Sequence, residues 1–225
     1  MSTAQYFLRR IFVSVIVFFG VSIVIFCLAR LIPGDPARIA LGPFATKEMV
    51  EQLRETLHLN ESIFIQYKIF IEQLFQGDLG ISTYTKRPVV TDIISYFPAT
   101  FELVLMSGTL MILIGMPLGI LSGKFKNTFV DHIARIISLL GVVTPSFLWA
   151  IILMLLFAYW MPIFPVAERY DETLDPPKII TGLLLIDSLI ARDLNFFKDA
   201  LFHLFLPGLA IAMPAIGNVS RLTRT

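Results

Sequence analysis

The chain has 225 residues, of which 56% are hydrophobic and 16% carry a charge, whereas about 25% of the residues of a typical soluble domain are charged. The formal net charge of +1 gives none of the basic excess that marks nucleic-acid-binding proteins. A single cysteine, Cys27, excludes a disulfide framework or a cysteine-based metal site built within this chain. This composition indicates a membrane protein.

The first apolar segment, residues 11–32, follows Arg9 and Arg10 and carries no charge before Arg30. A helix of about 20 apolar residues crosses the bilayer core, and helix is favoured there because backbone polar groups must be paired within the segment. The alternative is a signal peptide, whose apolar core would be about 7–15 residues long. Because this segment is longer and no small-residue cleavage site follows it, we expect an uncleaved transmembrane helix.

Three further apolar segments are long enough to cross a membrane, namely residues 99–121, 136–160 and 201–219. A shorter apolar run, residues 179–185, is too brief to span, and we expect it to be buried or interfacial outside the membrane. The sequence therefore predicts an all-α, polytopic membrane protein with four transmembrane helices.

The charge distribution predicts that both termini are cytoplasmic. Three short segments would then face the cytoplasm: residues 1–10, 122–135 and 220–225. Together they hold one acid, Asp131, and seven basic residues: Arg9, Arg10, Lys124, Lys126, Arg135, Arg221 and Arg224. The long connections hold ten basic residues and fifteen acids, but charges in long loops carry little topological information, so the short segments decide the orientation.

The first outer connection, residues 33–98, is expected to contain short amphipathic helices. Thr46 is placed as an N-cap, with apolar residues following on one helix face. A second helix is expected over about residues 62–76, ending at Gly77. We expect these helices to lie on the outer membrane surface, because about 65 residues without disulfides make a marginal independent core. The proline-rich second connection, residues 161–200, is expected to be an ordered loop with a short helix.

Four glycines of the second predicted span suit close helix packing. Gly115, Gly119 and Gly123 recur at a spacing of four residues, and Gly108 precedes them by two turns. Glycines at such spacing let another helix approach closely in a membrane. We expect this span to be buried among helices.

Prolines and polar residues of the third and fourth predicted spans are candidates for lining or gating a translocation pathway. The candidates are Thr144, Pro145, Ser146, Pro207, Pro214 and Asn218. Each proline frees a carbonyl group that needs a partner in a neighbouring helix or a wet cavity. Pro207 and Pro214 are seven residues apart and therefore share a helix face. A kink without further purpose is the alternative.

Glu102 is the one charged residue of the second predicted span. We expect it in the first turn of that helix, after Pro98 and Thr100, where a carboxylate interacts favourably with the helix dipole. Contact with a transported cargo is the alternative role. His203 is expected at the outer end of the fourth span, while His58 and His132 fall on opposite sides of the membrane, so no metal site is predicted.

Sequence motifs of enzymes do not occur in the chain. It has no G-x-x-x-x-G-K-[ST], H-E-x-x-H, G-x-S-x-G or G-x-G-x-x-G. We therefore expect no catalytic residues, and no ATP bound by this chain with the usual machinery.

Distinctive short segments are spread in order over the whole chain. They include Tyr6-Phe7-Leu8-Arg9-Arg10, Leu31-Ile32-Pro33-Gly34-Asp35-Pro36, Gly77-Asp78-Leu79-Gly80-Ile81-Ser82, Pro98-Ala99-Thr100-Phe101-Glu102-Leu103, Pro145-Ser146-Phe147 and Arg221-Leu222-Thr223-Arg224-Thr225. Together these segments resemble the dipeptide/oligopeptide/nickel permease family, the inner-membrane component of binding-protein-dependent ABC importers. Residues 181–187 and 195–200 resemble the dipeptide branch in particular.

The resemblance implies an inner-membrane permease that imports di- or oligopeptides. Its implied partners are a second, similar permease, two cytoplasmic ATPases that bind the ATP, and a substrate-binding protein that delivers cargo to the outer face. Nickel or glutathione import by the same family, or a truncated scaffold that transports nothing, are the alternatives.

The resemblance also implies a domain organisation. Residues 1–32 would form the cytoplasmic N-terminus and first transmembrane helix, residues 33–98 a periplasmic helical connection, and residues 99–225 a core permease domain. Family members continue past the position of Arg224 into an E-A-A-type loop that contacts the ATPase and two further spans. Arg221 and Arg224 would thus lie near the ATPase-coupling side, and we expect the chain to be a fragment or the product of a shortened gene.

Overall fold

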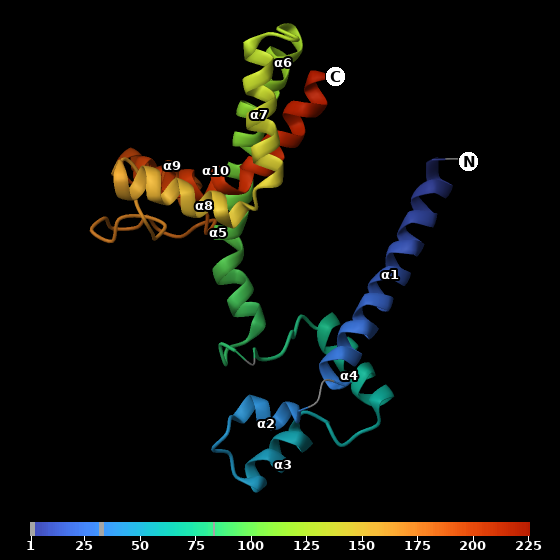
Figure 1. Ribbon diagram of the computed structural model, residues 1–225. Coiled ribbons are helices and arrows are strands. Elements are labelled where there is room, and N and C mark those ends of the chain that lie inside the picture. The colour runs from blue at the N-terminus through green and yellow to red at the C-terminus, as the bar shows by residue number, and fades with distance from the viewer. Residues whose placement is uncertain (1–2, 32–33, 83) are drawn as a thin grey trace. The chain divides into compact units, whose positions relative to one another are not determined.

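The computed structural model describes residues 3–31, 34–82 and 84–225 (Figure 1). The secondary structure of these residues is helical, apart from an isolated antiparallel bridge between Ile81 and Pro88. The chain divides into two compact units, Met1–Ile93 and Ile94–Thr225. The predicted end of the first span, residue 32, and the predicted start of the outer connection, residue 33, lie outside the described residues.

The first unit is built around α1 (Thr3–Leu31), a candidate membrane span over Thr3–Leu28 whose side chains are mostly exposed. Phe26 of α1 packs against Tyr67 and Phe70 of α4 (Ile63–Phe75), with ring centroids 5.3 and 5.6 Å apart. Ser22 Oγ also lies 2.8 Å from the Tyr67 hydroxyl. These contacts hold α4 against the C-terminal half of α1.

Two shorter helices of this unit are capped by side chains. Asp35 caps α2 (Pro36–Leu41) by accepting a hydrogen bond from the Ala37 amide, and Thr46 caps α3 (Lys47–Thr56) by accepting one from the Met49 amide at 3.3 Å. The predicted N-cap at Thr46 is therefore confirmed. Asp35 also joins the two helices, because its Oδ2 lies 3.1 Å from Arg54 Nε.

The second predicted span begins earlier than expected. α5 (Val89–Leu110), a π-helical segment η1 (Met111–Gly115) and α6 (Met116–Lys124) form one candidate span, Val89–Lys124. Helix α5 begins after Pro88, whose carbonyl oxygen accepts hydrogen bonds from the Thr91 and Asp92 amides. Pro98 lies inside the helix instead of opening it.

The third predicted span, residues 136–160, is not one straight helix. α7 (Phe129–Val143) ends before Thr144, and α8 (Ser146–Met154) with its π-helical extension η2 (Leu155–Trp160) leaves at an angle of 112°. Proline disfavours helical geometry at the residue before it and donates no backbone hydrogen bond. Thr144 is accordingly extended, with ψ of 124°, and Pro145 starts the next helix. The predicted count of four spans therefore holds only if this bent pair counts as one.

A short helix and a long one complete the second unit. α9 (Leu184–Ile190) partly overlaps the run predicted over residues 179–185, and α10 (Leu194–Arg224) is the last candidate span. α10 is the centre of the unit, because it contacts α6, η1, α7, α8 and α9. Two buried apolar clusters form along it: Leu153, Ala158, Leu206 and Ala210, and Leu110, Ala212 and Ile216.

Candidate functional site

Three of the four predicted packing glycines bring α6 and η1 against α10. A Cβ atom built on Gly119 would lie 2.6 Å from Thr223 Cβ and 2.7 Å from the Ser220 carbonyl oxygen. The corresponding nearest distances are 3.2 Å at Gly115 and 3.3 Å at Gly123. At Gly108 an added Cβ would meet no described atom within 4 Å. The strip facing α10 thus begins at Gly115, and Gly108 is not part of it.

A second close approach, which the sequence reasoning missed, joins α7 to α10. A Cβ atom on Gly141 would lie 2.6 Å from the Met213 carbonyl oxygen, and one on Gly217 would collide with the Ser138 carbonyl oxygen. The available signal was the run of small residues Ala134, Ser138 and Gly141 along one face of α7, all buried. Helix α10 is therefore held between two helices at backbone contact distance.

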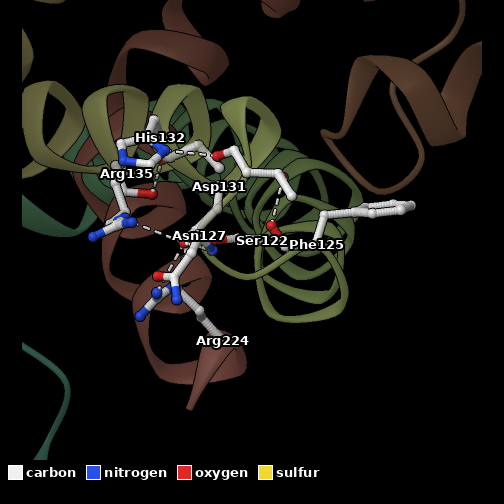
Figure 2. A network of polar contacts seen from close by, with 10 residues as sticks. Ser122, Phe125, Asn127, Asp131, His132, Arg135 and Arg224 are labelled. Atoms are coloured by element: carbon white, nitrogen blue, oxygen red, sulfur yellow. Dashed lines mark hydrogen bonds and ion pairs between the residues drawn. The ribbon is translucent and has the colours of Figure 1, made fainter.

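A buried carboxylate lies where α6, α7 and α10 meet, and Figure 2 shows its partners. The Asp131 residue has 0% of its surface exposed. Its Oδ1 accepts hydrogen bonds from Ser122 Oγ at 2.6 Å and from Arg224 Nε at 2.8 Å. Its Oδ2 accepts from the Asn127 amide at 2.9 Å, Arg135 Nη2 at 2.8 Å and Arg224 Nη2 at 3.0 Å.

These contacts, here called the Asp131 network, give the buried carboxylate two guanidinium partners and a hydroxyl group. A buried charge is tolerated when its partners are charged and its lone pairs are occupied, and both conditions hold here. The sequence placed Arg224 near a coupling side but gave no sign of this ion pair. Arg221, in contrast, is exposed and donates to Asn218 Oδ1 at 2.8 Å. The network fixes the last turn of α10 to the turn between α6 and α7.

Glu102 occupies a different place from the one predicted. It lies well inside α5, whose first residue is Val89, so the expected interaction with the N-terminus of its own helix is wrong. It is 7% exposed, and its Oε2 accepts from Arg169 Nη2 at 2.8 Å. Its Oε1 accepts from the Leu185 amide in the first turn of α9, also at 2.8 Å. Glu102 therefore ties the connection between η2 and α10 to α5.

The same connection is held together by Asp187 of α9. The Asp187 carboxylate accepts hydrogen bonds from the amides of Ile180, Thr181 and Gly182 and from the Thr181 hydroxyl. Burial by itself would raise the pKa of Asp187, but these hydrogen bonds to the charged form hold the pKa below its usual value. Ring contacts also hold the connection against α10, since Phe164 stacks on Phe205 at a centroid distance of 5.0 Å. The predicted ordered loop with a short helix is thus observed.

Two cavities lie under this connection and share Glu168, His203 and Pro207 in their walls. The first, of about 230 Å³, is also lined by Glu102 and Arg169. The second, of about 270 Å³, extends toward α8. The structure thus brings together two of the predicted pathway residues, Glu102 and Pro207.

The other predicted pathway residues lie elsewhere. Thr144, Pro145 and Ser146 form the break between α7 and α8. Pro214 lies further along α10, and Asn218 is exposed near its end. Among the described residues, neither cavity has any of these five in its lining. The described residues also contain no group of three or more His, Cys, Asp and Glu side chains suited to a metal ion.

The described residues contain three helices long and apolar enough to cross a bilayer, or four spans if the bent pair α7 and α8–η2 counts as one, which fits a polytopic membrane protein. Residues 3–104 match the family model described as "Binding-prot-dependent transport system membrane comp, N-term", and residues 115–225 match "Binding-protein-dependent transport system inner membrane component". The chain belongs to this family of transporter permease subunits, as its sequence resemblance predicted.

Two of the similar proteins are named as dipeptide permeases and a third as a glutathione permease. The probable D,D-dipeptide transport system permease protein DdpB of Escherichia coli K12 is 40% identical over 96% of this chain and 64% of its own length. The dipeptide transport system permease protein DppB of Alkalihalophilus pseudofirmus is 34% identical over 98% of this chain and 66% of its own length. The glutathione transport system permease protein GsiC of Escherichia coli O6:H1 is 31% identical over 70% of this chain and 53% of its own length. The chain thus spans about two thirds of the length of the first two relatives.

Proposed function

We propose that this chain is a permease subunit of an ABC importer that moves di- or oligopeptides across the inner membrane. The observation that carries the proposal is the match of nearly the whole chain to relatives named as dipeptide permeases, at 40% and 34% identity. The cavity lined by Glu102 and Pro207 supports it, because a transported solute needs polar groups in an otherwise apolar wall.

The proposed orientation places both termini in the cytoplasm. The seven basic residues and one acid of the short segments support it, since positive charge accumulates on the cytoplasmic side. In this orientation α2, α3, α4 and the connection over residues 161–200 lie on the periplasmic side, and the Asp131 network lies at the inner membrane boundary. The units 1–32, 33–98 and 99–225 remain the proposed domains.

The proposed partners are a second homologous permease, two cytoplasmic ATPases and a periplasmic substrate-binding protein. ATP is bound by the ATPases, and this chain is neither an enzyme nor the holder of a cofactor. Arg221 and Arg224 lie near the coupling side. Because α10 is held between α6 and α7 by the glycine contacts and at its end by Asp131, these three helices are suited to move as one body. Such a body would pass motion at the inner boundary to the cavities near Pro207.

We propose two roles for the predicted pathway residues, one in the cavity walls and one at hinges or gates. Glu102 and Pro207 belong to the cavity walls, and Thr144, Pro145, Ser146, Pro214 and Asn218 are proposed as hinge or gate positions of the helices around them. The 112° bend at Thr144 and Pro145 supports a hinge there, because proline has no backbone N–H to donate across the break. Substrate would move by alternating access.

Glutathione import is the second candidate, favoured by the relative GsiC. Reconstitution tests both candidates. The importer that contains this chain is placed in proteoliposomes with its partner permease, ATPases and binding protein. ATP-dependent accumulation of labelled alanyl-alanine supports peptide import, accumulation of glutathione alone favours the second candidate, and accumulation of neither contradicts both.

A further inference from the structure

The two cavities beneath the connection over residues 161–200 share one acidic side chain, Glu168. Its backbone has φ of 69°, a left-handed conformation that is uncommon for a residue with a side chain. Such conformations persist where the surrounding structure enforces them, and they are concentrated at ligand sites. The backbone strain by itself assigns no role to Glu168. The position of Glu168, however, puts a carboxylate in the wall of both cavities.

Glu168 has no hydrogen bond or ion pair to any described residue, unlike the other two charged groups of the first cavity. Glu102 and Arg169 pair with each other at 2.8 Å and so neutralise one another. Glu168 is exposed, and it adds to the wall a negative charge that no described residue pairs. The remaining lining is mostly apolar and includes Ala99, Leu103 and Leu204.

His203 of α10 also lines both cavities, and its side chain is only 8% exposed. Its Nδ1 lies 2.9 Å from the Asp199 carbonyl oxygen and 3.5 Å from the Asp199 carboxylate. The second ring nitrogen, Nε2, has no hydrogen bond to the described part of the chain. Because His203 lines both cavities, this nitrogen is available to a polar group of a ligand there.

A ligand for these walls needs one positive charge and an apolar body. The α-amino group of a peptide has a pKa of about 7.7–8.0 and is charged at pH 7. A metal ion is a poorer match, because no group of three metal-binding side chains occurs among the described residues. A pocket with mostly apolar walls and a few polar groups is typical of small-molecule sites.

We propose that Glu168 forms a subsite for the protonated amino group of the transported peptide, in the cavities that it lines with His203. The inference rests on the proposed function, since the substrate class comes from there. Glu168 accepts hydrogen bonds from the ammonium group, His203 Nε2 meets a neighbouring polar atom of the peptide, and the apolar walls receive its side chain.

Photolabelling tests the subsite without the binding protein. The assembled permease and ATPase complex in nanodiscs is irradiated with the dipeptide photoleucyl-alanine, and the labelled residues are identified by mass spectrometry. Labelling is expected between residues 165 and 169 and around His203. It should fall on the order of tenfold when the probe is N-acetylated, because a charged hydrogen bond is lost. Absence of labelling there, or labelling that N-acetylation leaves unchanged, would overturn the subsite.

Variants of Glu168 separate the carboxylate from its unusual backbone. Glu168→Gly relieves the positive φ, so a purely structural role predicts normal transport, whereas the subsite predicts loss. Glu168→Gln should also lower both labelling and uptake, and Glu168→Asp should keep most of both. Glu172→Gln, a change at an exposed acid of the same connection, is the matched control and should leave both at the wild-type level.

Photolabelling and peptide uptake together distinguish failure of the subsite proposal from failure of the peptide-import proposal. Labelling that depends on Glu168, without uptake of alanyl-alanine, would contradict peptide import while supporting an amine subsite. Normal peptide uptake by Glu168→Gln and Glu168→Gly, without specific labelling, would contradict the subsite and leave peptide import supported.

Discussion

Arg224, in the last turn of α10, and Asp131, in the first turn of α7, form a two-pronged ion pair although 93 residues separate them in sequence. The Nε–Oδ1 distance is 2.8 Å and the Nη2–Oδ2 distance is 3.0 Å. Paired hydrogen bonds between guanidinium and carboxylate fix orientation as well as distance. The direction in which α10 ends is thus determined by the turn between α6 and α7.

Replacing Asp131 should destabilise the helical core. Asp131→Ala leaves Arg224 and Arg135 without their shared carboxylate, so we expect the melting temperature of the detergent-solubilised permease to fall by about 5 °C or more. The exposed pair of Arg221 with Asn218 supplies the control, and Arg221→Ala should change the melting temperature little. The double variant Asp131→Ala, Arg224→Ala should lose less than the sum of the two single losses. Additive losses would argue against direct coupling of the pair.

Gly119 and Gly108 form a matched pair for testing helix packing. Leucine at Gly119 would overlap Thr223 and Ser220, so we expect Gly119→Leu to reduce the yield of folded, assembled permease to less than about half. At Gly108 an added Cβ would meet no described atom within 4 Å, so we expect Gly108→Leu to be tolerated by the folded chain. Yield is measured by size-exclusion chromatography after equal membrane insertion of the variants. Equal yields for Gly119→Leu and wild type would contradict the packing role.

The connection around α9 should lose its order in acid. Because hydrogen bonding lowers the folded-state pKa of Asp187, its contribution to stability is complete above the unfolded-state pKa of about 3.9 and is lost as the pH falls through the folded-state value. Amide hydrogen exchange of residues 180–187 should therefore accelerate below about pH 4 relative to the neighbouring core. Asp187→Asn should show fast exchange already at neutral pH and little further change with acid. Unchanged protection of the wild type down to pH 2 would show that other contacts hold the segment.

Cysteine labelling tests the proposed orientation. In a variant that lacks Cys27, a cysteine at Thr173 should react with an impermeant maleimide added to spheroplasts, because the connection over residues 161–200 is proposed to be periplasmic. A cysteine at Asn127, in the turn between α6 and α7, should react only after the membrane is permeabilised. Labelling of Asn127 from outside would reverse the topology.

Local features were predictable because they depend on neighbouring residues. Hydropathy located the apolar segments, and capping chemistry located the start of α3 at Thr46. The bend at Pro145 was indicated only as a kink, because a proline sets where a helix breaks but not the direction in which the next helix leaves. The 112° angle accompanies the packing of Leu153 and Ala158 of the α8–η2 segment against Leu206 of α10.

Glu102 shows where local reasoning failed. The helix that contains it was expected to start after Pro98, yet α5 starts at Val89 and continues through that proline. Its partners, Arg169 and the Leu185 amide, lie 67 and 83 residues away in sequence. No spacing rule connects such positions, because the contact exists only once the connection has folded over α5.

By itself, the sequence determined that the chain is a helical membrane protein of the binding-protein-dependent permease family, since length, hydropathy and ordered motifs are properties of the chain read in one dimension. Only the tertiary structure decided that Asp131 is buried under two arginines, that Gly141 and Gly217 bring α7 onto α10, and that Glu168 and His203 share cavity walls. The physical reason is that burial and pairing depend on distances between helices far apart in sequence, which are fixed by packing.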